Sequence, residues 1–249
     1  MAGTAEAIED RREAFFADPD DTETIHRFRT NSRRLRSLLA FVKPWHKRKE
    51  NAKAQIILRD IVRHTSRLRE LDVLGEQVRL NPGSSPELLA FCEAEAATER
   101  AKVLQILASS QVTEAYERAM GFAKHVTWKS RIADGGLSEH EVRARFDALV
   151  ASVTADLDAL DLSDAERTHD VRKRAKRARY VSELYTDLLG TDAVDIARDM
   201  MAHQDKLGDV CDARANIRLI DEFPSQDLPE TLAQELAQLR ARNDALLRT

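Results

Sequence analysis

A segment of eleven residues occurs twice in this chain, and both copies carry the same basic pattern. The first copy reads HRFRTNSRRLR from residue 26, and the second reads HDVRKRAKRAR from residue 169, so that the residue numbers of the two copies differ by a constant offset of 143. The copies agree in type at seven of eleven steps: histidine at the first, basic residues at +3, +7, +8 and +10, and apolar residues at +2 and +9. A weaker match, at an offset of 142, pairs TSRLRE from residue 65 with LGDVCD from residue 207. This self-similarity indicates two related halves that each build the same helix.

Helical patterns fill the sequence between a small number of breakers. The 249 residues include only 8 glycines and 6 prolines, and no stretch shows sustained strand alternation. We therefore expect an all-α protein of two antiparallel four-helix bundles, residues 1–134 and 135–249, which together form one module. The predicted helices cover residues 3–17, 22–43, 48–80, 87–131 with a break near Ser109-Ser110, 138–160, 164–189, 192–221 and 229–247.

A helical projection places the basic residues of each copy on one face. At 100° per residue, His26, Arg29, Arg33 and Arg36 fall within about 80° of one another, and Phe28 and Leu35 lie opposite. The second copy behaves in the same way, with His169, Arg172, Lys176 and Arg179 on one face and Val171 and Ala178 opposite. Like charges four residues apart destabilise a helix by about 0.2–0.5 kcal/mol per pair. Such a face therefore indicates that an external anion supplies the missing charge.

The charge of the whole chain is segregated in the same sense. Residues 27–69 hold fourteen Lys/Arg and two acids, an excess of +12, and residues 167–179 hold seven basic residues and one acid, an excess of +6. Since the formal net charge is −4, the rest of the chain carries −22. Arginine suits phosphate because its planar fork donates two parallel hydrogen bonds. The pattern predicts a polyanion site at His26, Arg29, Arg33, Arg34, Arg36, His169, Arg172, Lys173, Lys176, Arg177 and Arg179, with a further stripe at Arg59, Arg63 and Arg67.

Other classes of site find little support in the sequence. Cys92 and Cys211 form no CxxC pair, and the arginines that follow His26 and His169 disfavour a bound cation, so we expect no metal and no cofactor. No apolar run is long enough to cross a membrane, and the N-terminus lacks a secretory core. Nucleic acid is the main alternative ligand, because basic stripes also bind phosphodiesters. A metal-binding or phosphate-accepting histidine is the second alternative.

The two copies, together with HQDKLGDVCDA from residue 203 and RELDV from residue 69, resemble the conserved histidine α-helical domain, CHAD. The resemblance implies two four-helix bundles related by a pseudo-twofold axis, with a basic groove or pore between them. It also implies binding of inorganic polyphosphate without catalysis. The family's basic positions fall on His26, Arg29, Arg33, Arg34, Arg36, His169, Arg172, Lys176, Arg177 and Arg179.

The sequence departs from the family pattern at two places. Cys211 stands where the family often has Asn, and Thr65-Ser66 replaces the usual Leu-Gly of the first half. Relatives often carry a CYTH-type catalytic domain with an ExExK strand, and this segment is not found here, so we expect a stand-alone module that is not an enzyme. We expect a cytoplasmic location, with polyphosphate granules as one place of action, and neither a membrane nor nucleic acid as partner.

Overall fold

The computed structural model describes residues 1–224 and 228–248, with the side chain of Arg48 left aside. The described residues are almost entirely helical, and an isolated bridge between His46 and Trp128 is the one β-type pairing recorded among them. The predicted all-α class is therefore confirmed. The helices are α1 (Ala2–Ala17), α2 (Thr22–Val42), α3 (Arg48–His64), α4 (Ser66–Leu80), α5 (Pro86–Ala108), α6 (Ser110–Lys124), α7 (Ser130–Gly135), α8 (Glu139–Asp158), α9 (Ala165–Leu184), α10 (Thr186–Leu189), α11 (Asp192–Asp221) and α12 (Glu230–Leu246).

The two helices that carry the repeated segment begin in the same way. The Asp21 carboxylate accepts a hydrogen bond from the Glu23 N–H at the start of α2, and the Asp164 carboxylate accepts one from the Arg167 N–H at the start of α9. An N-cap of this kind satisfies one of the free N–H groups of the first turn. Asp21 and Asp164 are related by the same offset of 143, so the helix starts keep the register of the repeat.

The single helix expected over residues 48–80 is divided in the structure at Thr65. The Thr65 hydroxyl donates to the carbonyls of Ile61 and Val62, and its backbone leaves the helical region. The Arg29 guanidinium of α2 reaches the same point and donates to the Val62 carbonyl at 2.7 Å. A tertiary contact therefore fixes the break between α3 and α4, and the local pattern alone did not predict it.

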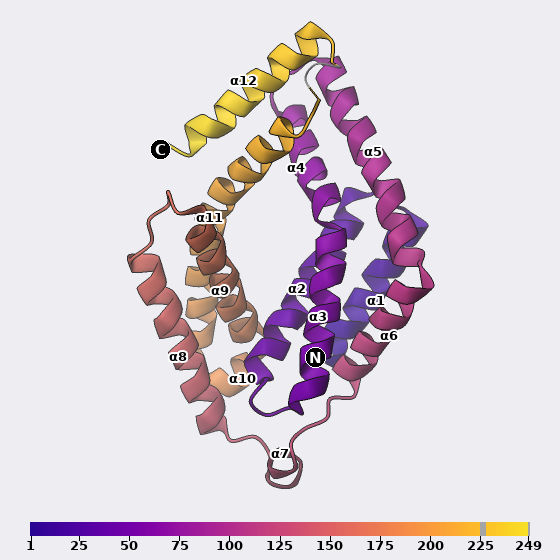
Figure 1. Cartoon of the computed structure of the whole chain (residues 1–249). Coiled ribbons are helices and arrows are strands. Elements are labelled where there is room, and N and C mark those ends of the chain that lie inside the picture. The colour runs from indigo at the N-terminus through magenta and orange to yellow at the C-terminus, as the bar shows by residue number, and fades with distance from the viewer. Residues whose placement is uncertain (225–227, 249) are drawn as a thin grey trace.

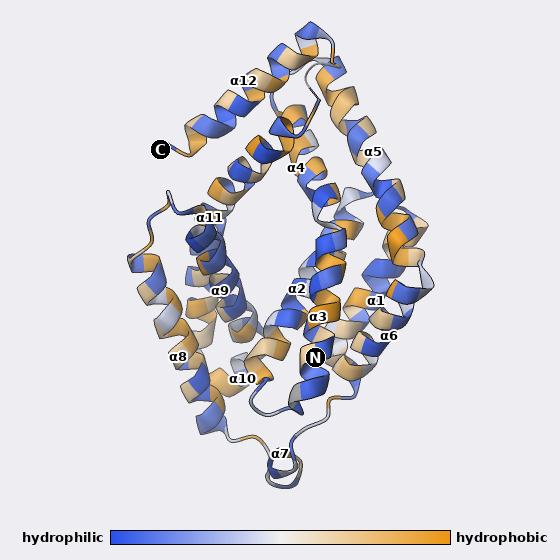
Figure 2. Cartoon of the chain, in the orientation of Figure 1, coloured by the Kyte–Doolittle hydropathy of each residue, from blue (hydrophilic) through white to orange (hydrophobic). Residues whose placement is uncertain are grey.

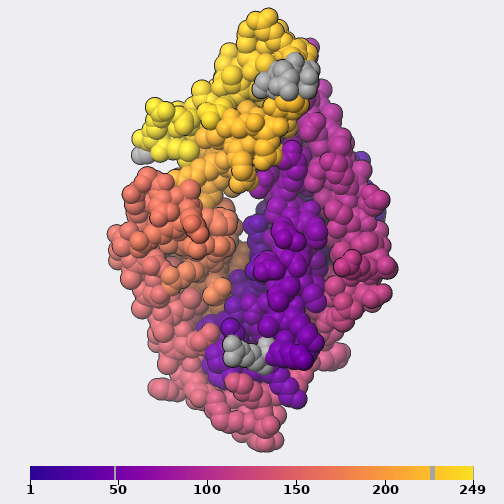
Figure 3. Space-filling view, in the orientation of Figure 1, coloured from indigo at the N-terminus to yellow at the C-terminus, as the bar shows by residue number. Residues whose placement is uncertain are grey.

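Figure 1 shows the helices arranged as a frame around a central region. The helices α2, α4, α9 and α11 border this region, and α1, α5, α6, α8 and α12 lie on the outside of the frame. The space-filling view in Figure 3 shows a small opening through the molecule, between α11 and the indigo-to-purple helices of the N-terminal part of the chain. Hydrophilic residues cover most of α9 (Figure 2), in keeping with a helix that borders a solvent-filled space.

The apolar core extends across the predicted boundary at Asp134-Gly135-Gly136. The largest cluster joins α1–α6 to the end of α11 and to α12, with Phe91 and Phe223 in edge contact at 5.0 Å between ring centroids. A second cluster joins the C-terminal part of α2 to α7–α10, and a third joins α8, α9 and α11. Helices from each half therefore pack against helices of the other half. The division into two bundles at residue 134 stays a prediction. No helix in the described part of the chain is long and apolar enough to cross a membrane.

Candidate anion-binding groove

A groove of about 590 Å³ lies among α2, α4, α9 and α11. We call it the central groove. Among the described residues that line it are seven arginines or lysines, two histidines and two acids. The basic residues are Arg29, Arg33, Arg69, Arg172, Lys176, Arg214 and Arg218, the histidines are His26 and His169, and the acids are Glu70 and Asp212. The lining therefore carries a formal excess of five positive charges, counting Lys176 as charged and both histidines as neutral.

Six of the predicted site residues line the central groove. These are His26, Arg29 and Arg33 from α2 and His169, Arg172 and Lys176 from α9. The projected helix faces of the two copies thus meet across one space. Packing of α2 against α9 brings them together, although their residue numbers differ by the repeat offset of 143.

The other predicted residues lie around the groove or beyond it. Lys173 pairs with Asp170 at 2.5 Å, and Arg67 pairs with Glu222. Arg59 and Arg63 both pair with the carboxylate of Asp60, at 3.3 and 3.8 Å, on an exposed part of α3. The remaining four, Arg34, Arg36, Arg177 and Arg179, flank the crossing of α2 and α9. Whether any of these eight contacts an anion stays a prediction.

Three basic lining residues were not among the predicted ones. Arg69 comes from α4, and Arg214 and Arg218 come from α11. Cys211, Arg214 and Arg218 are spaced by three and four residues, which places them on one helical face. This spacing is the signal in the sequence that could have identified Arg214 and Arg218. Arg218 pairs with Glu70 at 2.9 Å across the groove, so α4 and α11 are also joined there.

Arg29 is the most deeply buried cation of the groove, with 4% of its surface exposed. Its guanidinium donates to the Val62 carbonyl at 2.7 Å and to the Thr65 hydroxyl at 2.6 Å. Burial, and then the proximity of Arg33, lowers the pKa of Arg29 to about 9. The charge is thus held in place by protein acceptors rather than by a carboxylate.

Arg172 occupies the corresponding step of the second copy and is less constrained. It donates from Nε to the Gln204 carbonyl at 3.4 Å, and its guanidinium lies against Gly208. A Cβ at Gly208 would come within 3.1 Å of Nη2 of Arg172. The guanidinium can keep its position because residue 208 has no side chain. The part of the chain that the structure describes provides no other hydrogen bond to the Arg172 guanidinium, so the rest of the fork can bind a ligand in the groove.

Lys176 and Arg33 face each other in the groove without an ion-pair partner among the described residues. Burial, followed by the Arg172 and Arg33 guanidinia, lowers the pKa of Lys176 to about 7. The pKa of Arg33 is also lowered, first by burial and then by Arg172. Each of these cations lowers the pKa of its neighbours. Such repulsion is expected in a groove that binds an anion, because the bound anion would relieve it.

The two histidines belong to the same electrostatic environment. Desolvation, followed by Arg69, lowers the pKa of His26, and desolvation, followed by Lys173, lowers the pKa of His169. Both imidazoles are therefore neutral at pH 7 in the free groove, and a nearby phosphate would favour their protonation. The described residues contain no group of three or more His, Cys, Asp or Glu arranged to hold a metal ion.

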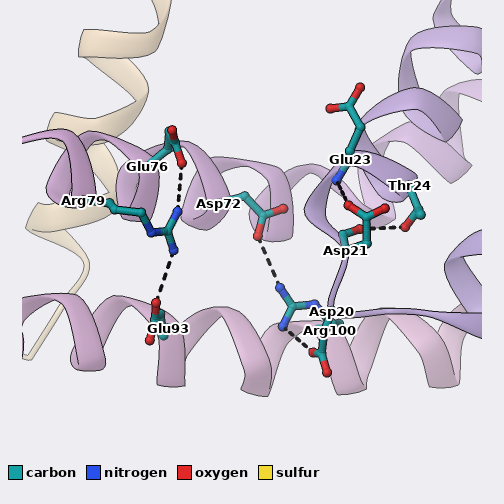
Figure 4. Close-up of polar contacts among 9 residues, drawn as sticks. All are labelled: Asp20, Asp21, Glu23, Thr24, Asp72, Glu76, Arg79, Glu93 and Arg100. Atoms are coloured by element: carbon teal, nitrogen blue, oxygen red, sulfur yellow. Dashed lines mark hydrogen bonds and ion pairs between the residues drawn. The ribbon is translucent and has the colours of Figure 1, made fainter.

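A second cavity, of about 650 Å³, adjoins the groove and shares Arg69, Val73 and Asp212 with it. In Figure 4, Arg100 of α5 lies between Asp72 and Asp20, at 3.5 and 3.3 Å from their carboxylates. The Asp72 side chain is 2% exposed, its Oδ2 has no partner among the described residues, and burial raises its pKa to about 6. This cavity is lined by more acids than arginines, so it limits the basic surface on that side.

A family model for the CHAD domain matches residues 1–221, and the chain therefore belongs to the CHAD domain family. The resemblance predicted from the repeated segments is confirmed.

Two of the solved structures that are similar to this chain illustrate the likeness. The crystal structure of the CHAD domain from the plant Ricinus communis has 22% sequence identity and a TM-score of 0.80, over 98% of this chain and 83% of that one. PptA from Streptomyces chartreusis has 17% identity and a TM-score of 0.63, over 99% of this chain and 92% of that one. At these identities the likeness establishes the fold. No match among curated proteins reached significance.

Proposed function

We propose that this protein binds inorganic polyphosphate in the central groove and does not catalyse a reaction on it. The observation that carries the proposal is the convergence of seven Lys/Arg side chains from four helices on one space of about 590 Å³. Arginine forks bind phosphate oxygens by paired hydrogen bonds, and burial together with neighbouring cations lowers the pKa values of Lys176 and Arg29, a cost that a bound anion would relieve. Membership of the CHAD family supports polyphosphate as the anion.

The shape and chemistry of the groove favour a bare phosphate chain over nucleic acid. Tyr180 is the aromatic residue of the lining, and the Arg179 and Arg34 guanidinia lie 4.8 and 5.8 Å from its ring centroid. A tyrosine whose ring is already engaged by arginine offers a poor platform for stacking a base. Polyphosphate needs no such platform, because all of its binding groups are anionic oxygens.

Calorimetric titration with polyphosphates of defined length, beside single-stranded DNA and Mg²⁺ or Zn²⁺, tests the proposal. We expect affinity to rise with chain length and to weaken steeply with salt, as for any ligand held by several charge contacts. Phosphate release should stay at the background rate. Equal affinity for DNA and polyphosphate would reject polyphosphate as the specific ligand, and release of phosphate would reject binding without catalysis.

Charge reversal tests the location of the site. We expect Arg33→Glu combined with Lys176→Glu to abolish polyphosphate binding, because both residues face the groove. The matched control is Arg118→Glu combined with Arg198→Glu, two exposed arginines of α6 and α11 that do not line the groove. This control changes the net charge equally. If both pairs weaken binding to the same extent, attraction to the whole protein rather than the groove is responsible.

A further inference from the structure

The two sides of the crossing between α2 and α9 are related by the repeat but differ in charge. Arg34 of α2 corresponds to Arg177 of α9, and Arg36 corresponds to Arg179, at the offset of 143. The same offset pairs Ser37 with Tyr180 and Ala40 with Glu183. The arginines are thus retained in both copies, whereas the residues beside them are not.

On one side of the crossing the arginines are neutralised. The Glu183 carboxylate lies 3.4 Å from Arg34 and 3.3 Å from Arg179, and Tyr180 lies against both guanidinia. We call this side the closed side. Two cations, one carboxylate and one ring form a cluster in which the charge is already shared within the protein.

On the other side, which we call the open side, Arg36 and Arg177 have no such partners. Ala40 stands where a second Glu183 would be, and neither arginine forms a hydrogen bond or an ion pair with any described residue. The Nε atoms of all four arginines are buried without a hydrogen bond among the described residues, so the ion pairs with Glu183 are what distinguish the two sides. Both side chains are partly exposed, so their terminal nitrogens remain accessible to a ligand.

The open side is continuous with the central groove and with further positive charge. Burial lowers the pKa of Arg36, and its nearest cations, Arg33, Arg59 and Arg177, lower it in the same direction. Arg33 lines the groove, so the path from the groove to Arg36 is lined by cations. The nearby acid, Asp60, is already shared between Arg59 and Arg63.

We propose that a phosphate chain longer than the central groove leaves it on the open side, where Arg36 and Arg177 bind the next phosphates, while Glu183 closes the other side. This inference rests on the proposed binding of polyphosphate in the groove. It assigns a direction to the bound chain that the pseudo-symmetric repeat by itself does not provide. Carboxylate oxygens repel phosphate at close range, so a single acid is enough to distinguish the two sides.

The test exchanges the residues that distinguish the two sides. In Ala40→Glu the new carboxylate lies beside Arg36 and Arg177, and we expect affinity for long polyphosphate to fall about three- to tenfold, as two partly exposed charge contacts are lost. Tripolyphosphate, which the groove can hold alone, should bind within about twofold of wild type. Glu183→Ala should strengthen binding of the long chain, because it opens the second side.

Two further variants separate charge from shape and folding. Ala40→Gln has the size of the glutamate without its charge, and should bind the long chain as wild type does. Arg36→Gln combined with Arg177→Gln removes the contacts without adding a side chain, and should reproduce the selective loss. Thermal unfolding of each variant establishes that it is folded.

The outcomes distinguish this inference from the function on which it rests. If wild type binds neither tripolyphosphate nor long polyphosphate, the proposed function is wrong. If wild type binds both and Ala40→Glu leaves the long chain unchanged, weakens both ligands equally, or matches Ala40→Gln, the open side is not the exit and only the present inference is overturned.

Discussion

Arg29 and Arg172 stand at the same step of the repeated segment but are used differently in the folded chain. Both donate to a carbonyl of the helix packed beside them, Val62 for Arg29 and Gln204 for Arg172, and the numbers of these two acceptors differ by 142, the offset of the weaker match. Arg29 is 4% exposed and holds a second acceptor in Thr65. Arg172 is partly exposed and makes only the longer bond.

The difference originates in the neighbouring helices rather than in the arginines. In the first half Thr65 and Ser66 present hydroxyls to the guanidinium, and in the second half Leu207 and Gly208 present none. A guanidinium that donates to protein acceptors is fixed in position and has fewer N–H donors left for a ligand. A guanidinium that lies against a glycine keeps more of its donors for a ligand. We infer that, of the two corresponding arginines, Arg29 mainly positions helices and Arg172 mainly binds the proposed anion.

The largest expected effect separates these two roles. We expect Arg29→Ala to lower the free energy of unfolding by about 2 kcal/mol, because it removes two charged hydrogen bonds at the break between α3 and α4, offset in part by the burial of the cation. Arg172→Ala should cost less than about 1 kcal/mol of stability and should weaken polyphosphate binding about tenfold. Denaturant unfolding and calorimetry measure the two quantities.

Arg29 and Arg172 should differ in their contribution to polyphosphate binding as well as to stability. Folded Arg29→Ala protein, at a temperature well below its midpoint, should lose less affinity than Arg172→Ala. If the two variants change stability and affinity in equal proportion, the arginines have the same role and the inferred division is wrong.

The next expected effect concerns Arg33 and Lys176, which correspond in the repeat and differ in their ability to lose a proton. The free groove holds Lys176 at a pKa of about 7, facing Arg33 of α2, Arg172 and Arg179 of α9, and Asp212 of α11. A bound phosphate stabilises the ammonium and raises its pKa, so binding takes up a proton. Affinity should therefore increase as pH falls from about 9 to 7, by at most about tenfold per pH unit, and this contribution should be constant below pH 7.

Calorimetry in buffers of different ionisation enthalpy measures the proton uptake directly. Lys176→Arg places in the second copy the residue type that the first copy already has, and should remove the dependence between pH 7 and 9. His26 and His169, whose pKa values the groove lowers, should add a further increase in affinity at lower pH when they are protonated, and this increase should remain in Lys176→Arg. A wild-type profile that is flat from pH 9 to 7 would show that Lys176 does not contact the anion.

Much of this fold was predictable because helix boundaries are encoded locally. The helix starts expected at residues 22, 48, 138, 164 and 192 agree with the structure to within one residue, and the Asp21 and Asp164 caps account for two of them. The break at Thr65 was not predictable in the same way, since it depends on Arg29 arriving from another helix. Local sequence specifies where a helix can end, and tertiary contacts decide among the possible ends.

The groove was predictable to the extent that the repeat marks it. His26, Arg33, His169 and Lys176 share a face by helical spacing alone, and the structure brings both faces together. Arg214 and Arg218 carry no repeated pattern, and their place in the groove follows from the packing of α11 against α4 and α9. Arg59 and Arg63 of α3 are spaced like a site and share the carboxylate of Asp60 in their own helix, and their contact with an anion stays a prediction.

The smallest expected effect is that of a side chain added at Gly208, where the first copy has Ser66. In Gly208→Ala the new Cβ would lie 3.1 Å from Nη2 of Arg172, the far end of a flexible side chain, so the guanidinium should move by a few tenths of an ångström. We expect stability to rise by up to about 1 kcal/mol, because alanine favours the interior of a helix over glycine, and polyphosphate affinity to fall about two- to threefold. Gly121→Ala in α6 is the matched control, since no atom outside its own helix backbone and chain neighbours lies within 4 Å of the added Cβ, and it should raise stability without changing affinity. An unchanged affinity in Gly208→Ala would mean that the position of the Arg172 fork does not limit binding, and the contrast between the two arginines would then rest on Arg29 alone.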